Sequence, residues 1–221
     1  MKLRRPRLSC LSIAMILFAL IILIVAILLR PLTLPKPEAL SAAFAPVVVA
    51  PLKPVSAFNA IVDPAARSVA LFQEAGRVIR HPRCMNCHPR TDRPTQTDAM
   101  RPHMPAVARG PDGAGDPHLR CATCHNDANF TGRDVPGNPQ WLLALIEQAW
   151  QGRSLGETCR QLFDPARSYI TRAELLEHMA NDALVGWAWH PGGDRPPAPG
   201  TQAQFGALIA AWRETDARWP A

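Results

Sequence analysis

The sequence shows little of the apolar–polar alternation that marks β-strands, and it has no internal repeat beyond two short motifs. A predominantly β-sheet protein is therefore disfavoured. The βαβ pattern of a thioredoxin-like redox protein is also missing. The periodicity that is present has helical spacing, so we expect a mostly α fold with long irregular loops.

A basic stretch that could follow a nucleic-acid backbone is missing too, although the formal net charge is +6. The first 30 residues hold five basic residues and no acidic ones, which leaves only +1 for residues 31–221. Proteins that bind phosphate backbones concentrate basic side chains on one face or stretch. We therefore expect no nucleic-acid partner.

Charge is absent from residues 11–29, LSIAMILFALIILIVAILL. A helix of this length can cross a hydrocarbon core of about 30 Å. A cleaved signal peptide, the alternative, has a shorter apolar region that ends at a small-residue site. The A-x-A sequence nearest to that pattern, residues 43–45, lies well beyond the run and before Pro46. We therefore predict an uncleaved transmembrane anchor at 11–29, which attaches the chain to a membrane.

The residues before this run set its orientation. Four basic residues precede it: Lys2, Arg4, Arg5 and Arg7. By the positive-inside rule, this places a cytoplasmic basic N-terminus at 1–10 and exports the chain that follows the anchor. We expect a protein of the bacterial inner membrane with its main domain in the periplasm.

Two motifs carry the chemistry, CMNCH at residues 84–88 and CATCH at residues 121–125. The pattern Cys-x-x-Cys-His is typical of covalent haem c attachment, in which two thiols bond the porphyrin and the His is the proximal iron ligand. Such attachment takes place outside the bacterial cytoplasm, which agrees with export. We predict two covalently bound haem c groups, held by Cys84, Cys87, Cys121 and Cys124, with His88 and His125 as proximal ligands.

A zinc site is the alternative use of two Cys-x-x-Cys pairs. Such pairs are usually separated by about 15–20 residues, and neither needs a following His. Here the interval from Cys87 to Cys121 is longer, and both pairs carry the His. The spacing favours haem.

The second axial ligand of each iron is less clear from the sequence, because His and Met both serve in cytochromes. His178 falls on a predicted helix beside an apolar line, and His103 lies on the loop between the motifs. We predict that His103 and His178 ligate iron. Met179, Met104 and His190 stay open as alternatives, whereas His81 is tethered too close to His88 to reach the opposite face of the same haem.

Helix signals divide the rest of the chain. Proline recurs from Pro31 to Pro64, which favours a semi-rigid linker over 30–63 and a dihaem cytochrome c domain over 64–221. Asp63 and Pro64 form a cap and first turn, with the helix ending near Pro82. Capping boxes predict helices that start near residues 155, 172 and 202, and an apolar stripe predicts one over 141–150.

Two further side-chain environments can be predicted. Trp141, Trp150, Trp187 and Trp189 are expected mainly in the core, although they could also border the haems. Cys159 has no evident partner and is expected to be a buried free thiol.

Three segments together carry a family resemblance: HPRCMNCHPRTDRPTQ, RPHMPAVARGPDGAG followed by CATCH, and EHMANDALVGWAWHPGGDRPPAPGTQAQFGALIAAW. Over residues 65–215 the chain resembles small exported dihaem cytochromes, the cytochrome component of isoquinoline 1-oxidoreductase-like molybdenum hydroxylases. The resemblance implies electron transfer from a dehydrogenase or hydroxylase toward the respiratory chain, and it puts His103 and His178 in family-typical segments. Such tails often close with Cys-Pro; here Trp219-Pro220 stands instead, which removes a possible partner for Cys159.

The resulting hypothesis is a membrane-anchored periplasmic electron carrier rather than an enzyme, with redox proteins as its donor and acceptor. The alternative is a dihaem peroxidase-like enzyme with one open haem site. That chemistry needs acid–base groups beside the open iron, and the sequence alone offers no constellation for them.

Overall fold

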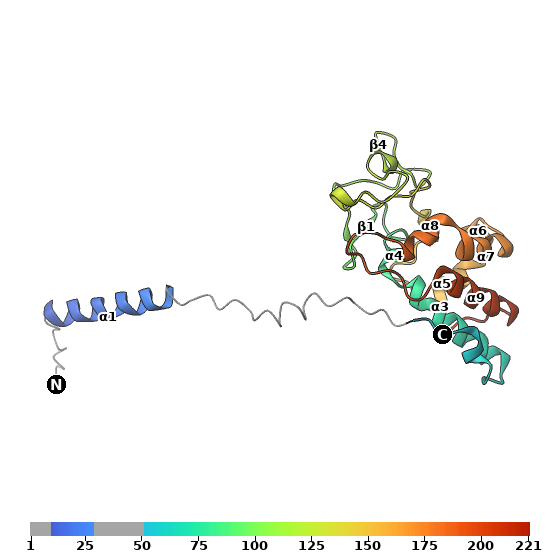
Figure 1. Ribbon diagram of the computed structural model, residues 1–221, viewed down its shortest axis with the longest axis horizontal. Coiled ribbons are helices and arrows are strands. Elements are labelled where there is room, and N and C mark those ends of the chain that lie inside the picture. Colours follow the sequence, from blue (N-terminus) through green and yellow to red (C-terminus); the bar gives the residue numbers. More distant parts are fainter. Residues whose placement is uncertain (1–9, 29–50) are drawn as a thin grey trace, which may run out of the picture. The chain divides into compact units, whose positions relative to one another are not determined.

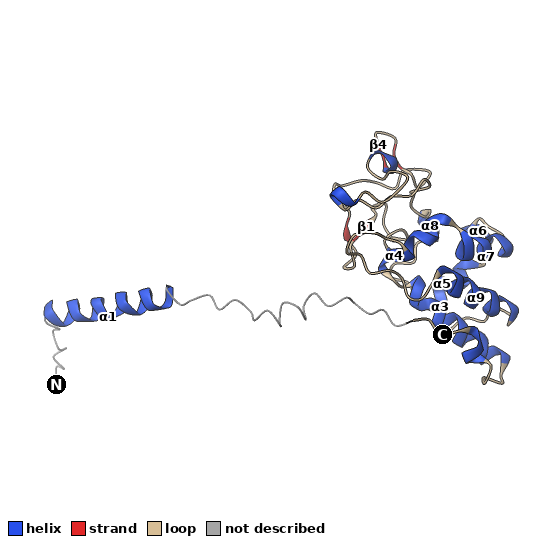
Figure 2. Cartoon of the chain, in the orientation of Figure 1, coloured by secondary structure: helices blue, strands red, loops and turns tan. Residues whose placement is uncertain are grey.

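The structure is a computed structural model that describes residues 10–28 and 51–221 (Figure 1). The chain divides into two units, Met1–Pro46 and Val47–Ala221. The described residues are mostly helical, as the sequence predicts, with four very short strands (Figure 2).

The described part of the first unit is helix α1, Cys10–Leu28, a run of 19 residues without a charged side chain. A helix here agrees with the prediction, and Leu29, the last residue of the predicted anchor, lies outside the described residues. Within the described ranges, no helix meets the combined requirement of length and apolar character for crossing a membrane. The anchor therefore stays a prediction.

The second unit is built around helix α3, Pro64–Ile79, which begins as predicted. The Asp63 carboxylate accepts hydrogen bonds from the backbone N–H groups of Ala65 and Ala66, at 3.4 and 2.9 Å. These are two of the donors that the first turn of a helix leaves unpaired. Pro64 at the first position loses no helical bond, because its missing N–H would have had no partner.

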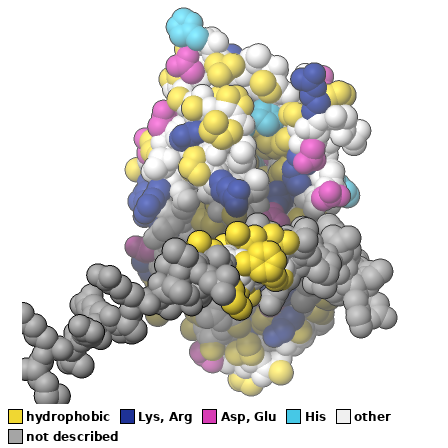
Figure 3. Space-filling view, turned by 90° about the vertical axis from the view of Figure 1, so that its left-hand side faces the viewer, with side chains coloured by type: hydrophobic (Ala, Val, Ile, Leu, Met, Phe, Trp, Pro, Cys, Tyr) yellow, Lys and Arg dark blue, Asp and Glu magenta, His cyan; other side chains and the backbone are white. Residues whose placement is uncertain are grey.

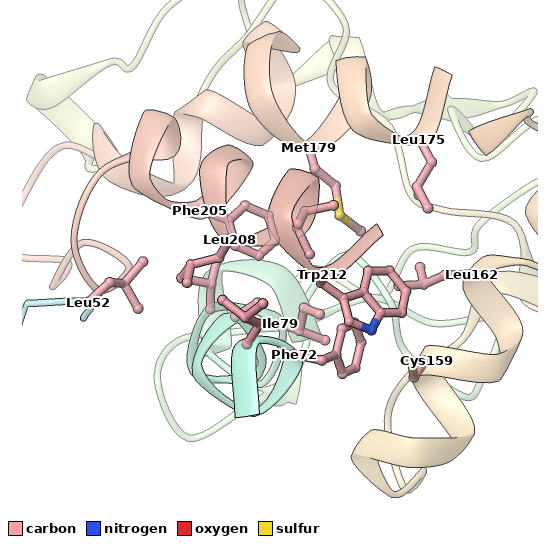
Figure 4. Packing of buried hydrophobic residues seen from close by; sticks show 14 of the residues in the cluster. Leu52, Phe72, Ile79, Cys159, Leu162, Leu175, Met179, Phe205, Leu208 and Trp212 are labelled. Atoms are coloured by element: carbon pink, nitrogen blue, oxygen red, sulfur yellow. The ribbon is translucent and has the colours of Figure 1, made fainter. Parts of the chain in front are cut away.

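The core lies between α3, α7 (Arg172–Asn181) and α9 (Gln202–Glu214). Figure 4 shows Phe72 and Ile79 of α3 facing Trp212 of α9. The Phe72 and Trp212 ring centroids are 4.5 Å apart, and both side chains are fully buried. Apolar burial on this scale is the main force that holds the helices together.

The predicted capping boxes are confirmed at the starts of α5 (Leu155–Leu162), α7 and α9. In each box a hydroxyl accepts from the third helical N–H, and the side chain of that residue returns a bond to the capping N–H. The pairs are Ser154 with Glu157, Thr171 with Glu174 and Thr201 with Gln204.

Short elements connect these helices. The one-turn α-helices are α4 (Pro82–Met85), α6 (Pro165–Ser168) and α8 (Ala183–Gly186). The 3₁₀ turns are η1 (Val55–Phe58), η2 (Cys121–Thr123), η3 (Thr131–Arg133), η4 (Ile146–Gln148) and η5 (Trp187–Trp189).

The loop between the motifs is more structured than expected. It forms two antiparallel pairs, β1 (Thr95–Gln96) with β2 (Arg101–Pro102) and β3 (Gly115–Asp116) with β4 (Leu119–Arg120). Strands of two residues are too short to show alternation in a sequence. They fold the loop back on itself, so that a small number of backbone bonds orders a long irregular segment.

The predicted helix over 141–150 is wrong. Only the single 3₁₀ turn η4 forms there. The backbone N–H groups of this segment bond distant carbonyls instead: Leu143 donates to Gly113 at 2.8 Å, Ala144 to Cys87 at 3.1 Å, and Trp150 to His88 at 3.0 Å. Tertiary bonds thus replace the helical ones and tie the segment to the first motif.

The second unit begins earlier than the predicted domain. Leu52 and Phe58 fall within the segment 30–63 assigned to the linker, yet they are 3% and 6% exposed and belong to the core cluster. Arg77 donates to the Pro51 carbonyl at 2.9 Å and fixes this entry segment on α3. Apolar side chains between the prolines allow it to pack on the domain.

Candidate functional site

The first motif follows α3 directly and starts in α4. His81 caps this turn, because its Nδ1 accepts from the Arg83 N–H at 3.3 Å. The Cys87 N–H then bonds the Cys84 carbonyl at 3.1 Å, and the His88 N–H bonds the Met85 carbonyl at 3.2 Å. One compact turn of chain therefore presents Cys84, Cys87 and His88 to the same side.

His88 is held by two contacts from segment 141–150, which forms no α-helix. Its Nδ1 lies 2.8 Å from the Gln148 carbonyl oxygen, and its ring stacks on Trp150 with centroids 3.6 Å apart and planes 4° from parallel. A carbonyl acceptor places the proton on Nδ1 and leaves the Nε2 lone pair for a metal. Burial lowers the pKa of His88 to about 4, against the smaller opposing effect of the Gln148 hydrogen bond.

A cavity of about 560 Å³ opens beside this motif. Its volume falls in the range of small-molecule and cofactor sites, roughly 300–1,000 Å³. The lining is largely apolar and includes Cys84, Cys87, His88 and Trp150, with α7 and α8 supplying the far side.

The second motif starts in η2 and repeats this arrangement. The His125 N–H bonds the Cys121 carbonyl at 3.0 Å, and its Nδ1 lies 2.7 Å from the Pro136 carbonyl oxygen. The imidazole stacks on Trp141 with centroids 4.6 Å apart. Burial lowers the pKa of His125 as well. In both motif histidines Nδ1 is thus engaged by a backbone carbonyl and burial favours the neutral imidazole, whose Nε2 could serve as a metal ligand.

A second cavity, of about 640 Å³, adjoins Cys121, Cys124 and His125. His103 borders it too, with its ring centroid 6.0 Å from that of His125. The Nδ1 of His103 is engaged by the Pro105 carbonyl at 2.9 Å, which again leaves Nε2. Imidazole nitrogens bind transition metals at about 2 Å, so the space between two such rings suits one metal ion.

The two cavities share part of their walls. Five residues border both: Arg83, Cys87, Trp141, Leu142 and Trp187. Trp141 and Trp187 meet edge to face, with centroids 4.9 Å apart and planes at 87°. Trp187 is fixed in turn by an indole N–H bond of 2.9 Å to the Asn129 side chain. Occupants of the two cavities would lie close together, separated by aromatic side chains.

His178 borders the first cavity from α7, the helix on which the sequence placed it. Its side chain is 45% exposed, and its Nδ1 lies 3.3 Å from Asp182 Oδ2. Met179, the neighbouring alternative, also reaches this cavity but is 3% exposed and belongs to the core. Of the two, His178 is freer to turn toward an occupant.

His81, His118 and His190 border neither cavity, whereas Met104 borders the second. His190 and His118 are exposed and border neither cavity, and His81 serves as a helix cap. Met104 borders the second cavity, 67% exposed, with its sulfur 3.3 Å from Arg93 Nη2. The structure therefore brings His103 to the second motif and His178 to the first.

The thiols of the motifs are all free, as is the buried Cys159. Burial raises the pKa of Cys84 to about 12 and that of Cys87 to about 11. Within residues 10–28 and 51–221, no three His, Cys, Asp or Glu side chains converge in a way that could hold a metal ion.

No family model, curated protein or solved structure matches this chain. The resemblance to dihaem cytochromes therefore rests on the quoted segments. What the structure adds is independent of it, namely a cavity of cofactor size beside each motif and a fixed imidazole in each.

Several residues of these sites were missed or misassigned from the sequence. Trp141 and Trp187 were expected mainly in the core, yet they are half-buried and wall both cavities. Trp150 belongs to the core, as expected, and borders the first cavity as well. Arg83, beside the first cysteine, carried no signal beyond its position. The carboxylates Glu174, Glu177 and Asp182, which line the first cavity with His178, were not foreseen as a group. The first two stand one turn apart on α7, a spacing that a search along that helix would have found.

Proposed function

We propose that this protein is a membrane-anchored dihaem c-type cytochrome that carries electrons in the bacterial periplasm, from a dehydrogenase or hydroxylase toward the respiratory chain. The observation that carries the proposal is the pairing of each Cys-x-x-Cys-His motif with its own cavity of 560 or 640 Å³ and a His whose Nδ1 is held by a backbone carbonyl.

The residues present fit the cofactor. Cys84 and Cys87 at one cavity, and Cys121 and Cys124 at the other, would form the thioether bonds. His88 and His125 would hold the irons as proximal ligands, and His178 and His103 would take the opposite positions. When bound, haem supplies one-electron chemistry at its iron; the protein supplies ligands, orientation and exclusion of water.

The shared wall supports transfer between the two sites. Trp141 stacks on His125 and meets Trp187, and both indoles border both cavities. Lys and Arg are interspersed with Asp and Glu over the face shown in Figure 3, which suits contact with redox partner proteins of either charge better than a nucleic acid. The uncharged stretch 11–29 supports the anchor.

Purified protein matured with haem-attachment machinery tests the proposal. We expect two haems per chain by pyridine haemochrome assay and c-type bands on reduction. The double substitution Cys84→Ser and Cys87→Ser should leave one haem. Cys159→Ser, which removes a thiol outside both motifs, should leave two. Absence of c-type bands in the wild-type protein would refute the proposal, and folding without that machinery would favour zinc.

One observation supports a second candidate, a dihaem peroxidase-like enzyme. His178 Nδ1 lies 3.3 Å from Asp182 Oδ2 and both residues border the first cavity, an arrangement suited to proton transfer if the iron beside His88 stays open. Electron paramagnetic resonance separates the two functions. Two low-spin ferric signals support a carrier, whereas a high-spin signal with turnover of hydrogen peroxide supports the enzyme.

A further inference from the structure

Arg83 is a buried guanidinium at the boundary of the two cavities. Its side chain is 3% exposed, and the residue borders both cavities. It directly precedes Cys84 in the sequence. Burial, and then the charge of Arg195 at the second cavity, lower the pKa of Arg83. Arg83 thus places a positive charge between the two motif sites.

The polar contacts of this guanidinium are incomplete. Its Nη2 forms an ion pair with the half-exposed carboxylate of Asp98. Neither Nε nor Nη2, however, makes a hydrogen bond of regular geometry with any described residue. A charged group withdrawn from water costs free energy unless hydrogen bonds and opposite charge compensate it. The buried face of Arg83 therefore lacks an acceptor.

Arg195 differs from Arg83 in this respect. Its guanidinium donates to the carbonyls of Pro191 and Gly192 and pairs with Asp134 Oδ1 at 2.9 Å. Arg195 is therefore satisfied by the protein, whereas Arg83 has donors left for a ligand. An arginine offers five N–H donors in a planar fork, which matches a carboxylate.

We propose that Arg83 binds a propionate carboxylate of the haem at the boundary of the two cavities, through the Nε side that the protein leaves unpartnered. This inference rests on the proposed function, since it assigns a residue to the same cofactor. Asp98 keeps its pairing with Nη2, and the propionate completes the set of acceptors. Arg83 also sets the redox potential, because a fixed positive charge beside a haem disfavours the more positively charged ferric state.

Arg83→Gln tests the assignment, with Arg80→Gln as the matched control. Arg80 is exposed and lies three residues away, so its substitution removes the same formal charge without touching either cavity. We expect Arg83→Gln to keep two haems per chain and to lower the midpoint potential of one. The expected size is at least tenfold in the one-electron equilibrium, about 59 mV. Equal shifts in the two variants would overturn the proposal.

A second variant, Arg83→Lys, tests the proposal if Arg83→Gln incorporates too little haem to be measured. Arg83→Lys keeps the charge but loses the planar fork, so its potential should lie near that of the wild type. The propionate bending band in resonance Raman spectra should shift. An unshifted band would contradict propionate binding. Haem-free wild-type protein would refute the proposed function itself. Two haems per chain, with no change in potential or propionate band on substitution of Arg83, would refute only this inference.

Discussion

The rings of His88 and Trp150 lie face to face, 3.6 Å apart at their centroids and 4° from parallel. The carbonyl that accepts from His88 Nδ1 belongs to Gln148, two residues before this indole. One short segment therefore fixes both the tautomer and the plane of the imidazole. The plane of an axial imidazole is among the properties through which a protein tunes a haem.

Trp150→Leu should therefore change the first haem without releasing it. Without the indole surface, the plane of the His88 ring is no longer fixed by stacking. We therefore expect altered g-values for one low-spin signal in electron paramagnetic resonance. Trp189→Leu is the control, because Trp189 packs on Phe205 and borders neither cavity. Each variant should lose about 1–3 kcal/mol of stability, since a large side chain that is buried (Trp150) or half-buried (Trp189) is shortened. Identical spectra for the two variants would show that Trp150 contributes to packing but does not fix the plane of the His88 ring.

The prediction for His103 concerns the second haem. His103→Ala should leave both haems attached, since the thioethers do not involve it, and should convert one iron to a high-spin or water-ligated form. Its ring lies 6.0 Å from that of His125 across the second cavity, which motivates the expectation. His118→Ala, an exposed His on the same loop that borders neither cavity, should change nothing. A low-spin spectrum in His103→Ala would show that His103 is not the ligand and would favour Met104 instead.

Local signals explain which parts of the fold were predictable. Asp63 before Pro64, and the capping boxes at Ser154, Thr171 and Thr201, act within one turn, so the starts of four helices can be derived from a few neighbouring residues. The stripe over 141–150 has helical spacing too. There, distant carbonyls of Cys87, His88 and Gly113 take the backbone N–H groups, and no local pattern records that competition.

The candidate site divides in the same way. The cysteines and proximal histidines follow from a five-residue motif. The acceptor of His88 Nδ1 is 60 residues away in the sequence, and the shared wall needs Trp141 and Trp187 to meet across the fold. Such contacts depend on how loops pack. Arg83 could be found only once its burial and its unpartnered Nε were known.

His178 gives the corresponding prediction for the first haem. His178→Ala should leave two haems attached, with one iron high-spin or water-ligated and its potential raised, because imidazole ligation favours lower potentials than Met ligation. His178→Met should partly restore a six-coordinate spectrum at higher potential. His190→Ala is the control, since His190 is exposed and borders neither cavity. Two unshifted low-spin haems in His178→Ala would show that His178 does not ligate.

The capping box of α7, the helix that carries His178, makes the stability of this helix depend on pH. The hydrogen bond from the backbone N–H of Thr171 to the Glu174 carboxylate lowers the pKa of Glu174, and the hydrogen bond with the Thr171 side chain lowers it further. A carboxyl whose pKa is lowered by folding stabilises the protein fully above its ordinary pKa of 4.5, and this contribution is lost as the pH falls through the folded-state value.

Glu174→Gln removes that charge but keeps an oxygen that can accept from the Thr171 N–H. We expect a lower Tm than the wild type at pH 7, with the two unfolding curves converging in acid below the folded-state pKa. Thr171→Ala is the contrast: it deletes the capping hydroxyl and should still cost about 1 kcal/mol in acid, where the Glu174 carboxyl is protonated. Calorimetry or circular dichroism from pH 7 to pH 3 measures both. A difference between wild type and Glu174→Gln that stays constant across this range would mean that the carboxylate charge does not stabilise α7.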